Sequence, residues 1–467
     1  MAEDAIAAEI PGRGLQRSPE KTYMPVEVKL VPLAASEVGS GKEPEYGPAL
    51  CLSGGGYRAT LFHLGALRRL NELGILRGLD VITSVSGGSI TNGVLATRWS
   101  NLTPGSNGTF TNFNEVVCRP VEEFCSKDLR TPLLIGPRLD LPNLGILIRN
   151  YLSVPANYLA DAYQPLLRQR LCDLPQPGKN TPRFVFCATN VKTGACWHFH
   201  GGPRARMGDF YVGYCDVGQV RVSDAVAASS AFPPGFSALE LERSATVNFT
   251  RVDPWGKTQP LSAKRHDQDH GDRSLPILLT DGGVYDNLGV EPVWKHYNTL
   301  FSSDAGSPFE SVSKSRQWIV SRLWRAVEIS TEQVAAVRRR WLLEELVKGT
   351  RKGAMWLINT LMEDFPAEKN CQGYSDAVRR RLWKVRTDLN YFSGGEIACL
   401  ENHGYSLADA AVRSYAPPAL YQNPGAPFQW PYPDWLDEEK CEAGLARSGD
   451  RGILRDILRM IWRLGQP

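Results

Sequence analysis

The sequence predicts an α/β fold with a mostly parallel central sheet, followed by a mainly helical C-terminal region. Two observations support this prediction. A short apolar run, a glycine turn and a helical pattern follow one another twice between residues 49 and 99. A parallel sheet produces this alternation, because a crossover helix must connect neighbouring strands. In contrast, the segment after residue 300 carries mostly helical patterns.

The first of these units begins with an apolar strand at 49–52. Leucines at helical spacing then predict a helix over 59–73, which Gly74 ends. The second unit has a strand at 81–85 and a helix at 89–99. Each strand runs directly into a glycine-rich turn.

Further strands are predicted at 184–188, 196–199 and 276–280, with a helix from Ser223 to Ser230. The Pro-rich segment 101–182 interrupts the pattern and is interpreted as an insertion over the sheet edge. In the C-terminal region, the capping-box spacing of Ser330 and Gln333 predicts a helix start. Short helices are also expected at 357–362 and 377–382.

The chain has 467 residues, more than one average domain. We expect a polar arm and linker at 1–46, an α/β domain at 47–300 that contains the insertion, and a mostly helical region at 301–467. An edge strand within the arm is expected at 26–31.

Composition excludes several classes of protein. Lys and Arg number 53 against 50 acidic residues, so the net charge of +3 does not favour nucleic-acid binding. No apolar run is long enough for a membrane-spanning helix. The ten cysteines form no C-x-x-C pair, which excludes a zinc ribbon. Reduced thiols and an N-terminus without an apolar signal segment suggest a cytoplasmic protein.

Ser86 lies in a turn between a predicted strand and a predicted helix, with Gly88 two residues later. A strained turn of this kind exposes a nucleophilic hydroxyl. Ser84 occupies the place of the first glycine of the usual G-x-S-x-G motif. An ordinary glycine-rich turn is the alternative interpretation.

Two other strand ends carry reactive groups. The amides of Gly54, Gly55 and Gly56 precede a helix and are suited to bind an oxyanion. A phosphate loop is disfavoured, because no Gly-Lys-Ser/Thr follows. Asp281 ends an apolar strand and is followed by two glycines, so it is a candidate general base, although Asp-Gly is also a common turn.

Histidine is scarce, with seven residues in the chain. A Ser-acid-His order would require His296 or His403, since only these follow Asp281. His198 and His200 alternate along a predicted strand but have no third metal ligand at a useful spacing, so no metal site is expected.

Together, the glycine loop with Tyr57-Arg58, the Ser86 turn and the Asp281 turn resemble the patatin-like phospholipases, a family related to cytosolic phospholipase A2. The segment 228–234 resembles the Ala-Ser-x-Ala-x-Pro helix end of this family. Residues 188–194 resemble the strand and turn that precede it. The resemblance covers roughly residues 47–300.

The resemblance implies a patatin-like three-layer fold and a lipid acyl hydrolase of the phospholipase A or lysophospholipase type. It implies that Ser86 is the nucleophile and Asp281 the base of a dyad without histidine. The amides of residues 54–56 would form the oxyanion hole, and no cofactor is expected. Four residues would support this site: Arg58, Gly88, Gly282 and Gly283.

Such an enzyme would bind a membrane surface as a peripheral protein to reach a phospholipid or lysophospholipid. Two segments could contact that surface: the apolar stretch 133–152, and a C-terminal amphipathic helix at 452–467 that carries three arginines. Packing of that helix against the protein is the alternative. The region 301–467 could also mediate homo-oligomer formation or bind a regulatory partner.

Two other functions remain open at this level. One is an α/β-hydrolase-type carboxylesterase that uses a histidine. The other is a catalytically inactive lipid-binding protein.

Overall fold

A computed structural model of the chain describes residues 46–133, 155–233, 235–241, 249–250, 252–256, 276–306, 319–366, 371–446 and 448. Three predicted features lie outside these residues: the N-terminal arm with its edge strand, the apolar stretch 133–152 apart from Leu133, and the C-terminal amphipathic helix.

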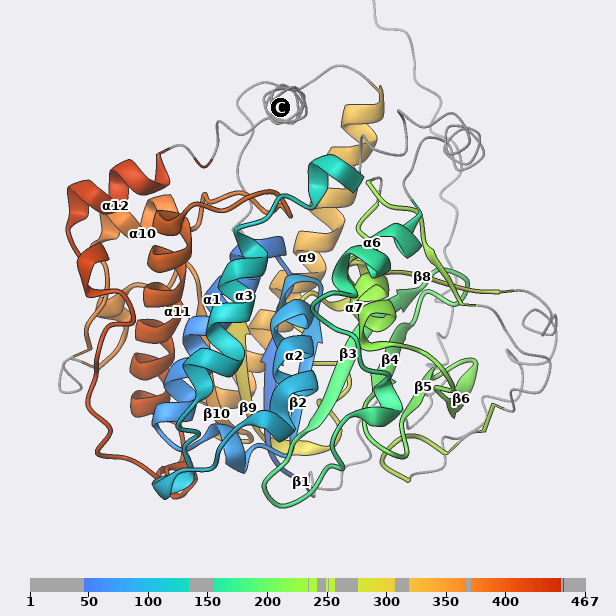
Figure 1. The fold of residues 1–467 in the computed structure, drawn as a ribbon, viewed down its shortest axis with the longest axis horizontal. Coiled ribbons are helices and arrows are strands. Elements are labelled where there is room, and N and C mark those ends of the chain that lie inside the picture. The colour runs from blue at the N-terminus through green and yellow to red at the C-terminus, as the bar shows by residue number, and fades with distance from the viewer. Residues whose placement is uncertain are drawn as a thin grey trace, which may run out of the picture. The chain divides into compact units, whose positions relative to one another are not determined.

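The described strands form one sheet (Figure 1). Their bounds are β1 (Tyr46–Leu52), β2 (Val81–Val85), β3 (Arg183–Asn190), β4 (Cys196–His200), β5 (Arg206–Asp209), β6 (Gly213–Asp216), β7 (Leu239–Leu241), β8 (Ile277–Asp281), β9 (Tyr297–Asp304) and β10 (Lys352–Leu357). The described α-helices are α1 (Gly56–Glu72), α2 (Gly87–Arg98), α3 (Arg119–Cys125), α6 (Ala156–Tyr163), α7 (Val222–Ser230), α8 (Gly283–Asp286), α9 (Ile319–Val347), α10 (Asp376–Leu382), α11 (Gly394–Tyr415) and α12 (Glu438–Leu445).

The strand order is β10-β9-β1-β2-β3-β4-β5-β6. The five strands from β10 to β3 are parallel, and an antiparallel extension runs from β3 through β4 and β5 to β6. β8 also pairs antiparallel with β3, and β7 pairs with β8. The predicted α/β class with its parallel core is confirmed. The antiparallel extension adds short strands for which the sequence analysis predicted no orientation.

Apolar residues on both faces of the sheet are buried, which makes the fold three-layered. In β1, Leu50 and Leu52 belong to the core under α1, α2 and α11, whereas Ala49 and Cys51 belong to a second core on the opposite face. Leu342 of α9 packs in this second core. Strands buried on both faces have continuous apolar runs, as the sequence shows at 49–52.

The C-terminal region contributes to the same sheet and core. The domain boundary predicted at residue 300 falls within β9, and β10 extends the sheet beyond it. The predicted helix at 377–382 is confirmed by α10. The helix predicted at 357–362 is wrong: Leu357 is the last residue of β10 and pairs with β9, a turn follows at 358–359, and a 3-10 helix begins only at Met362.

The predicted helix start at Ser330 is also wrong. Ser330 lies inside α9, which begins at residue 319. Its hydroxyl donates a hydrogen bond to the Ala326 carbonyl oxygen at 2.9 Å. A serine can thus satisfy its hydroxyl within a helix instead of capping one.

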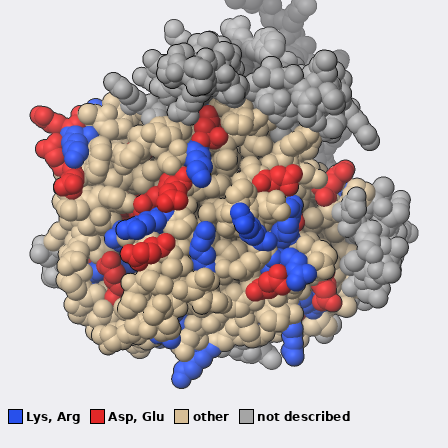
Figure 2. Space-filling model, viewed as in Figure 1, with Lys and Arg blue, Asp and Glu red and all other residues tan. Residues whose placement is uncertain are grey.

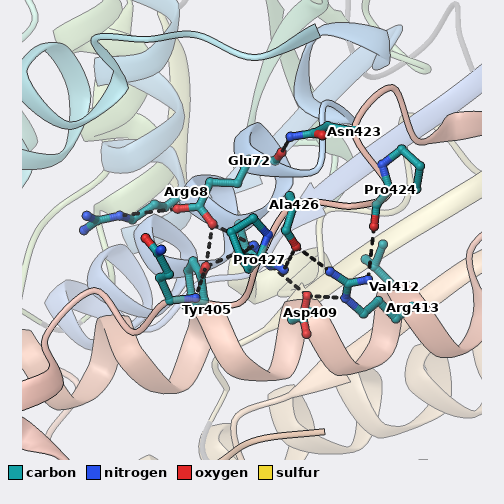
Figure 3. Close-up of polar contacts among 12 residues, drawn as sticks. Arg68, Glu72, Tyr405, Asp409, Val412, Arg413, Asn423, Pro424, Ala426 and Pro427 are labelled. Atoms are coloured by element: carbon teal, nitrogen blue, oxygen red, sulfur yellow. Dashed lines mark hydrogen bonds and ion pairs between the residues drawn. The ribbon is translucent and has the colours of Figure 1, made fainter. Parts of the chain in front are cut away.

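α1 and α11 cross at close range because each presents a glycine to the other. A Cβ atom on Gly404 would lie 1.8 Å from the Phe62 carbonyl oxygen, and one on Gly65 would lie 2.0 Å from the Glu401 carbonyl oxygen. A polar network next to this crossing joins the two helices to residues 423–427 (Figure 3). Within it, the Asp409 carboxylate accepts from Arg69 at 2.7 Å and from Arg413 at 2.8 Å.

We expect Gly404→Ala to lower the free energy of unfolding by about 3 kcal/mol or more, at the upper end of overpacking costs. The added methyl group would overlap a backbone oxygen, which cannot rotate away, so the two helices would have to separate. Urea unfolding measures the change. Gly394→Ala is the matched control, because a Cβ on Gly394 meets no atom within 4 Å. Equal unfolding midpoints for the two variants would contradict the expectation.

Candidate active site

Ser86 occupies the turn between β2 and α2, where it is the residue before the first helical turn. Its φ of 49° and ψ of −118° are a strained backbone conformation for a residue with a side chain. Two glycines make the turn possible. A Cβ on Gly87 would lie 2.0 Å from the Gly56 carbonyl oxygen, and one on Gly88 would lie 2.6 Å from the Leu52 carbonyl oxygen. This is the sharp strand-to-helix turn that the sequence predicts.

Asp281 lies at the end of β8, paired with Ala188 of β3. Its side chain is buried, and its Oδ1 accepts a hydrogen bond from the Gly283 amide at 2.7 Å. Ser86 lies near enough to this carboxyl group to lower its pKa, and both residues line the same cavity. The fold therefore brings together two residues that are 195 positions apart in the sequence.

Burial raises the pKa of the Asp281 carboxyl group to about 7, and the hydrogen bond with Gly283 and the nearby Ser86 oppose this rise. Desolvation favours the uncharged form of an acid, which explains the direction. A group with this pKa can accept and release a proton at neutral pH, as acid–base catalysis requires.

The glycine loop lies beside Ser86, and its three amides are not equivalent. The Gly54 amide donates to the Asn287 carbonyl oxygen at 3.0 Å, so it is already engaged. Gly55 and Gly56 have φ values of 141° and 57°, which favour glycine, and they stand at the start of α1. The first amides of a helix have no partner inside it and can bind an anion. Gly55 and Gly56 are therefore the better candidates for an oxyanion site.

Gly54 instead allows close packing. A Cβ atom there would lie 2.3 Å from Oδ1 of Asn287 and 3.2 Å from Cβ of Ser86. Asn287, at the end of α8, thus positions the glycine loop through its main chain and packs against it with its side chain. The sequence analysis missed Asn287, because no local pattern links it to residue 54.

Arg58 is buried and connects the start of α1, next to the glycine loop, to main-chain carbonyl groups of later segments. Its guanidinium group donates to the carbonyl oxygens of Val385 and Ala305, each at 2.8 Å. Burial lowers the pKa of Arg58 to about 10. These bonds occupy the guanidinium group with main-chain acceptors, as expected of a residue that supports the site structurally.

Gly282 and Gly283 follow the buried acid and leave space around it. A Cβ on Gly282 would lie 2.3 Å from the Cys187 carbonyl oxygen. On Gly283 it would lie 2.9 Å from Oδ1 of Asp281. Side chains at these positions would push β8 away from β3 or displace the carboxyl group.

A cavity of about 830 Å³ opens at this site and is lined by Ser86, Asp281 and residues 54–56. Its far walls come from segments that the sequence analysis did not connect with the site. They include Phe232 and Phe236, Arg325 and Glu328 of α9, and residues 383–389. The cavity therefore combines apolar walls with charged groups. Figure 2 shows acidic and basic side chains interspersed on the face turned to the viewer.

Of the described residues that line this cavity, none is a histidine. His403 lies in α11, where its Nε2 contacts the Ile358 carbonyl oxygen at 2.7 Å and burial lowers its pKa to about 4. His296 stacks on Trp255, with ring centroids 4.4 Å apart. These positions argue against the histidine-dependent esterase.

His198 and His200 are neighbours on β4, with ring centroids 5.8 Å apart. Among the described residues, no group of three or more His, Cys, Asp or Glu side chains could hold a metal ion. Within the same part of the chain, no helix is both long and apolar enough to cross a membrane.

The solved structures that match this chain are only weakly similar to it. Human GIVD cytosolic phospholipase A2 is 14% identical with a TM-score of 0.37, over 57% of this chain and 44% of that one. Its complex with methyl gamma-linolenyl fluorophosphonate and terbium chloride is 17% identical with a TM-score of 0.34, over 58% and 45%. VipD from Legionella pneumophila is 13% identical with a TM-score of 0.24, over 60% and 52%. The chain thus spans about half of the length of these proteins.

No curated protein matches the sequence. A family model described as patatin-like phospholipase matches residues 50–294, just over half of the chain. The matched range runs from β1 to the segment after α8 and contains Ser86, Asp281 and the glycine loop. The chain belongs to the patatin-like phospholipase family.

Proposed function

We propose that this protein is a lipid acyl hydrolase that cleaves phospholipid or lysophospholipid acyl esters with a Ser86–Asp281 dyad. One observation carries the proposal: the buried Asp281 carboxyl group and Ser86, which occupies a strained turn, line the same cavity, and Ser86 is near enough to lower the pKa of that acid. Family membership supports ester hydrolysis of lipids as the reaction.

In the proposed reaction, the Asp281 carboxylate accepts the proton of the Ser86 hydroxyl as Oγ attacks the acyl carbonyl carbon. The amides of Gly55 and Gly56 stabilise the negative oxygen of the tetrahedral intermediate. The C–O bond to the leaving alcohol then breaks, and Asp281 returns the proton to that alcohol. Water attacks the acyl-enzyme with the same base, which releases the fatty acid and restores Ser86.

The raised pKa of Asp281 predicts the pH dependence of this reaction. The carboxyl group can accept the Ser86 proton only when ionised, so kcat/KM should rise with pH and reach half of its plateau near pH 7. An Asp with its ordinary pKa of about 3.9 would give a flat profile above pH 5. The measurement uses a soluble chromogenic ester from pH 5 to 9, with circular dichroism to confirm folding. A flat profile would contradict the prediction.

We also propose that the enzyme is cytoplasmic and meets its substrate at a membrane surface as a peripheral protein. The apolar side chains Phe232 and Phe236 in the cavity wall suit an acyl chain.

Product analysis tests the proposed function. The protein is incubated with phosphatidylcholine or phosphatidylglycerol vesicles, and products are quantified by mass spectrometry. We expect equimolar free fatty acid and lysophospholipid, or glycerophospho-alcohol from a lysophospholipid. Protein blocked beforehand with an alkyl fluorophosphonate is the control. Absence of fatty acid release from both lipid classes, by protein that reacts with the fluorophosphonate, would restrict the activity to other esters.

A further inference from the structure

We infer that Ser229 is a positioning residue that holds the backbone of Ser86 through its hydroxyl group and the turn after Asp281 through its main chain. The inference deepens the proposed function and rests on it. Ser229 lies near the end of α7, which packs beside α2 and β8 (Figure 1). It is fully buried, so solvent does not compete for its hydroxyl.

The Ser229 hydroxyl group binds the main chain of Ser86. The Ser86 amide donates to Oγ of Ser229 at 2.9 Å, and the Ser229 hydroxyl donates to the Cys187 carbonyl oxygen at 2.6 Å. A carbonyl oxygen can only accept, so the Ser229 proton points toward Cys187 and leaves lone pairs for the Ser86 amide. Ser229 thereby connects the strained turn to strand β3.

A neighbouring hydroxyl group lies within hydrogen-bond distance of Ser229. Oγ of Ser89 in α2 lies 2.9 Å from Oγ of Ser229 and 3.0 Å from Oγ of Ser84, and its single proton can be donated to either oxygen. Ser84 and Ser89 are also fully buried. The small residues around the Ser86 turn thus form a connected set of hydroxyl groups that includes Ser84, the residue that replaces the usual glycine.

The main chain at the end of α7 binds the turn that follows β8. The Ser229 carbonyl oxygen accepts from the Gly282 amide at 3.2 Å, and the Ala231 carbonyl oxygen accepts from the Asp281 amide at 3.2 Å. The last carbonyl groups of a helix have no partner inside the helix and are available for such bonds. Ser229 therefore contacts one reactive residue through its side chain and the turn of the other through its main chain.

Loss of the Ser229 hydroxyl would leave the Ser86 amide without its acceptor in a buried turn. The strained backbone of Ser86 persists only while surrounding contacts enforce it. Relaxation of that turn would displace the Ser86 hydroxyl from Asp281, and a displacement of about 1 Å can lower a catalytic rate by about 10²-fold. Substrate contacts of the cavity walls would be unchanged.

Kinetics of Ser229→Ala test the inference against Ser223→Ala. Ser223 is a buried serine of the same helix whose hydroxyl has no hydrogen-bond partner among the described residues. We expect Ser229→Ala to lower kcat by roughly 10- to 100-fold with KM and the pH midpoint unchanged, and Ser223→Ala to retain wild-type kcat. Ser229→Thr keeps the hydroxyl and should recover at least half of the loss in kcat, measured on a logarithmic scale. Active sites are counted by fluorophosphonate incorporation, so rates refer to folded protein only.

A kcat of Ser229→Ala within twofold of Ser223→Ala would overturn the inference. Failure of Ser229→Ala to fold, or a loss of rate that Ser229→Thr does not recover, would also overturn it, since Ser229 would then serve the fold instead of the geometry of Ser86. Ser86→Ala is measured in the same series. Hydrolysis by Ser86→Ala would refute the proposed function itself, so the two failures are distinguishable.

Discussion

Replacement of Ser86 by alanine is expected to lower kcat for ester hydrolysis by about 10⁶-fold, the scale seen when a serine hydrolase loses its nucleophile. Without Oγ no acyl-enzyme forms, and the remaining amides and cavity walls can only bind the ester. The fold should not change, because Ser86 contributes its amide, not its hydroxyl, to the bond with Ser229. Fatty acid release from vesicles and covalent labelling by a fluorophosphonate are the two measurements.

The matched control is Ser126→Ala, which removes an exposed hydroxyl that donates a local hydrogen bond to the Glu123 carbonyl oxygen at 2.8 Å. This variant should hydrolyse and label like the wild type. If Ser86→Ala retained more than about one per cent of wild-type kcat, a loss far below the roughly 10⁶-fold expected, another group would have to be the nucleophile. Retained labelling would lead to the same conclusion and would direct the search to the labelled residue.

Replacement of Asp281 by asparagine is expected to have opposite effects on activity and stability. Asparagine can still accept the hydrogen bond from the Gly283 amide, but it cannot take the Ser86 proton. Removal of a general base should lower kcat by about 10²- to 10⁴-fold. The rise of kcat/KM around pH 7 should disappear as well, because the group that titrates is gone.

The sign of the stability change follows from proton linkage. Burial raises the pKa of Asp281 to about 7 in the folded protein, above the ordinary value in the unfolded chain. The stabilisation that results from this raised pKa is therefore fully present below about pH 4 and is lost as the pH rises toward 7. At pH 8 the wild type bears the cost of a buried carboxylate, on the order of a few kcal/mol, which Asp281→Asn removes. Urea unfolding at pH 5 and pH 8 measures the difference.

Asp216→Asn serves as the control, since Asp216 is exposed at the end of β6. The same chemical change there should alter neither kcat nor the free energy of unfolding. A variant Asp281→Asn that lost stability at pH 8 together with activity would contradict the expectation. That result would indicate that the carboxylate is needed for the fold.

Several features of the site were predictable from local patterns. A short apolar run followed by glycines identifies a strand end in a parallel sheet, and such ends meet at one edge, where ligands bind. Ser86, Asp281 and residues 54–56 all lie at such strand ends and are therefore identifiable as candidate reactive groups from the sequence. The strained φ of Ser86 follows from the same pattern, since glycines at 87 and 88 permit an approach that larger residues would block.

Other features depend on contacts between distant segments. Leu357, the first residue of the helix predicted at 357–362, is instead the last residue of β10 and pairs with β9. Residues 383–389 and α9 line the cavity although they lie beyond the range that the family model matches. Periodicity in the C-terminal region indicated helices but gave no information about what they pack against.

The sequence by itself therefore determined the class of fold, the strand ends that carry reactive groups and the identity of the proposed nucleophile and base, because each of these depends on residues close together in the chain. Only the tertiary structure decided the pKa and the hydrogen-bond partners of those groups. Burial sets the pKa of Asp281, the Asn287 carbonyl group engages the Gly54 amide, and Ser229 binds the amide of Ser86. The two hydrogen bonds join residues that are 143 and 233 positions apart, and the strand partner of Asp281 is 93 positions away, so no local pattern can reveal these contacts.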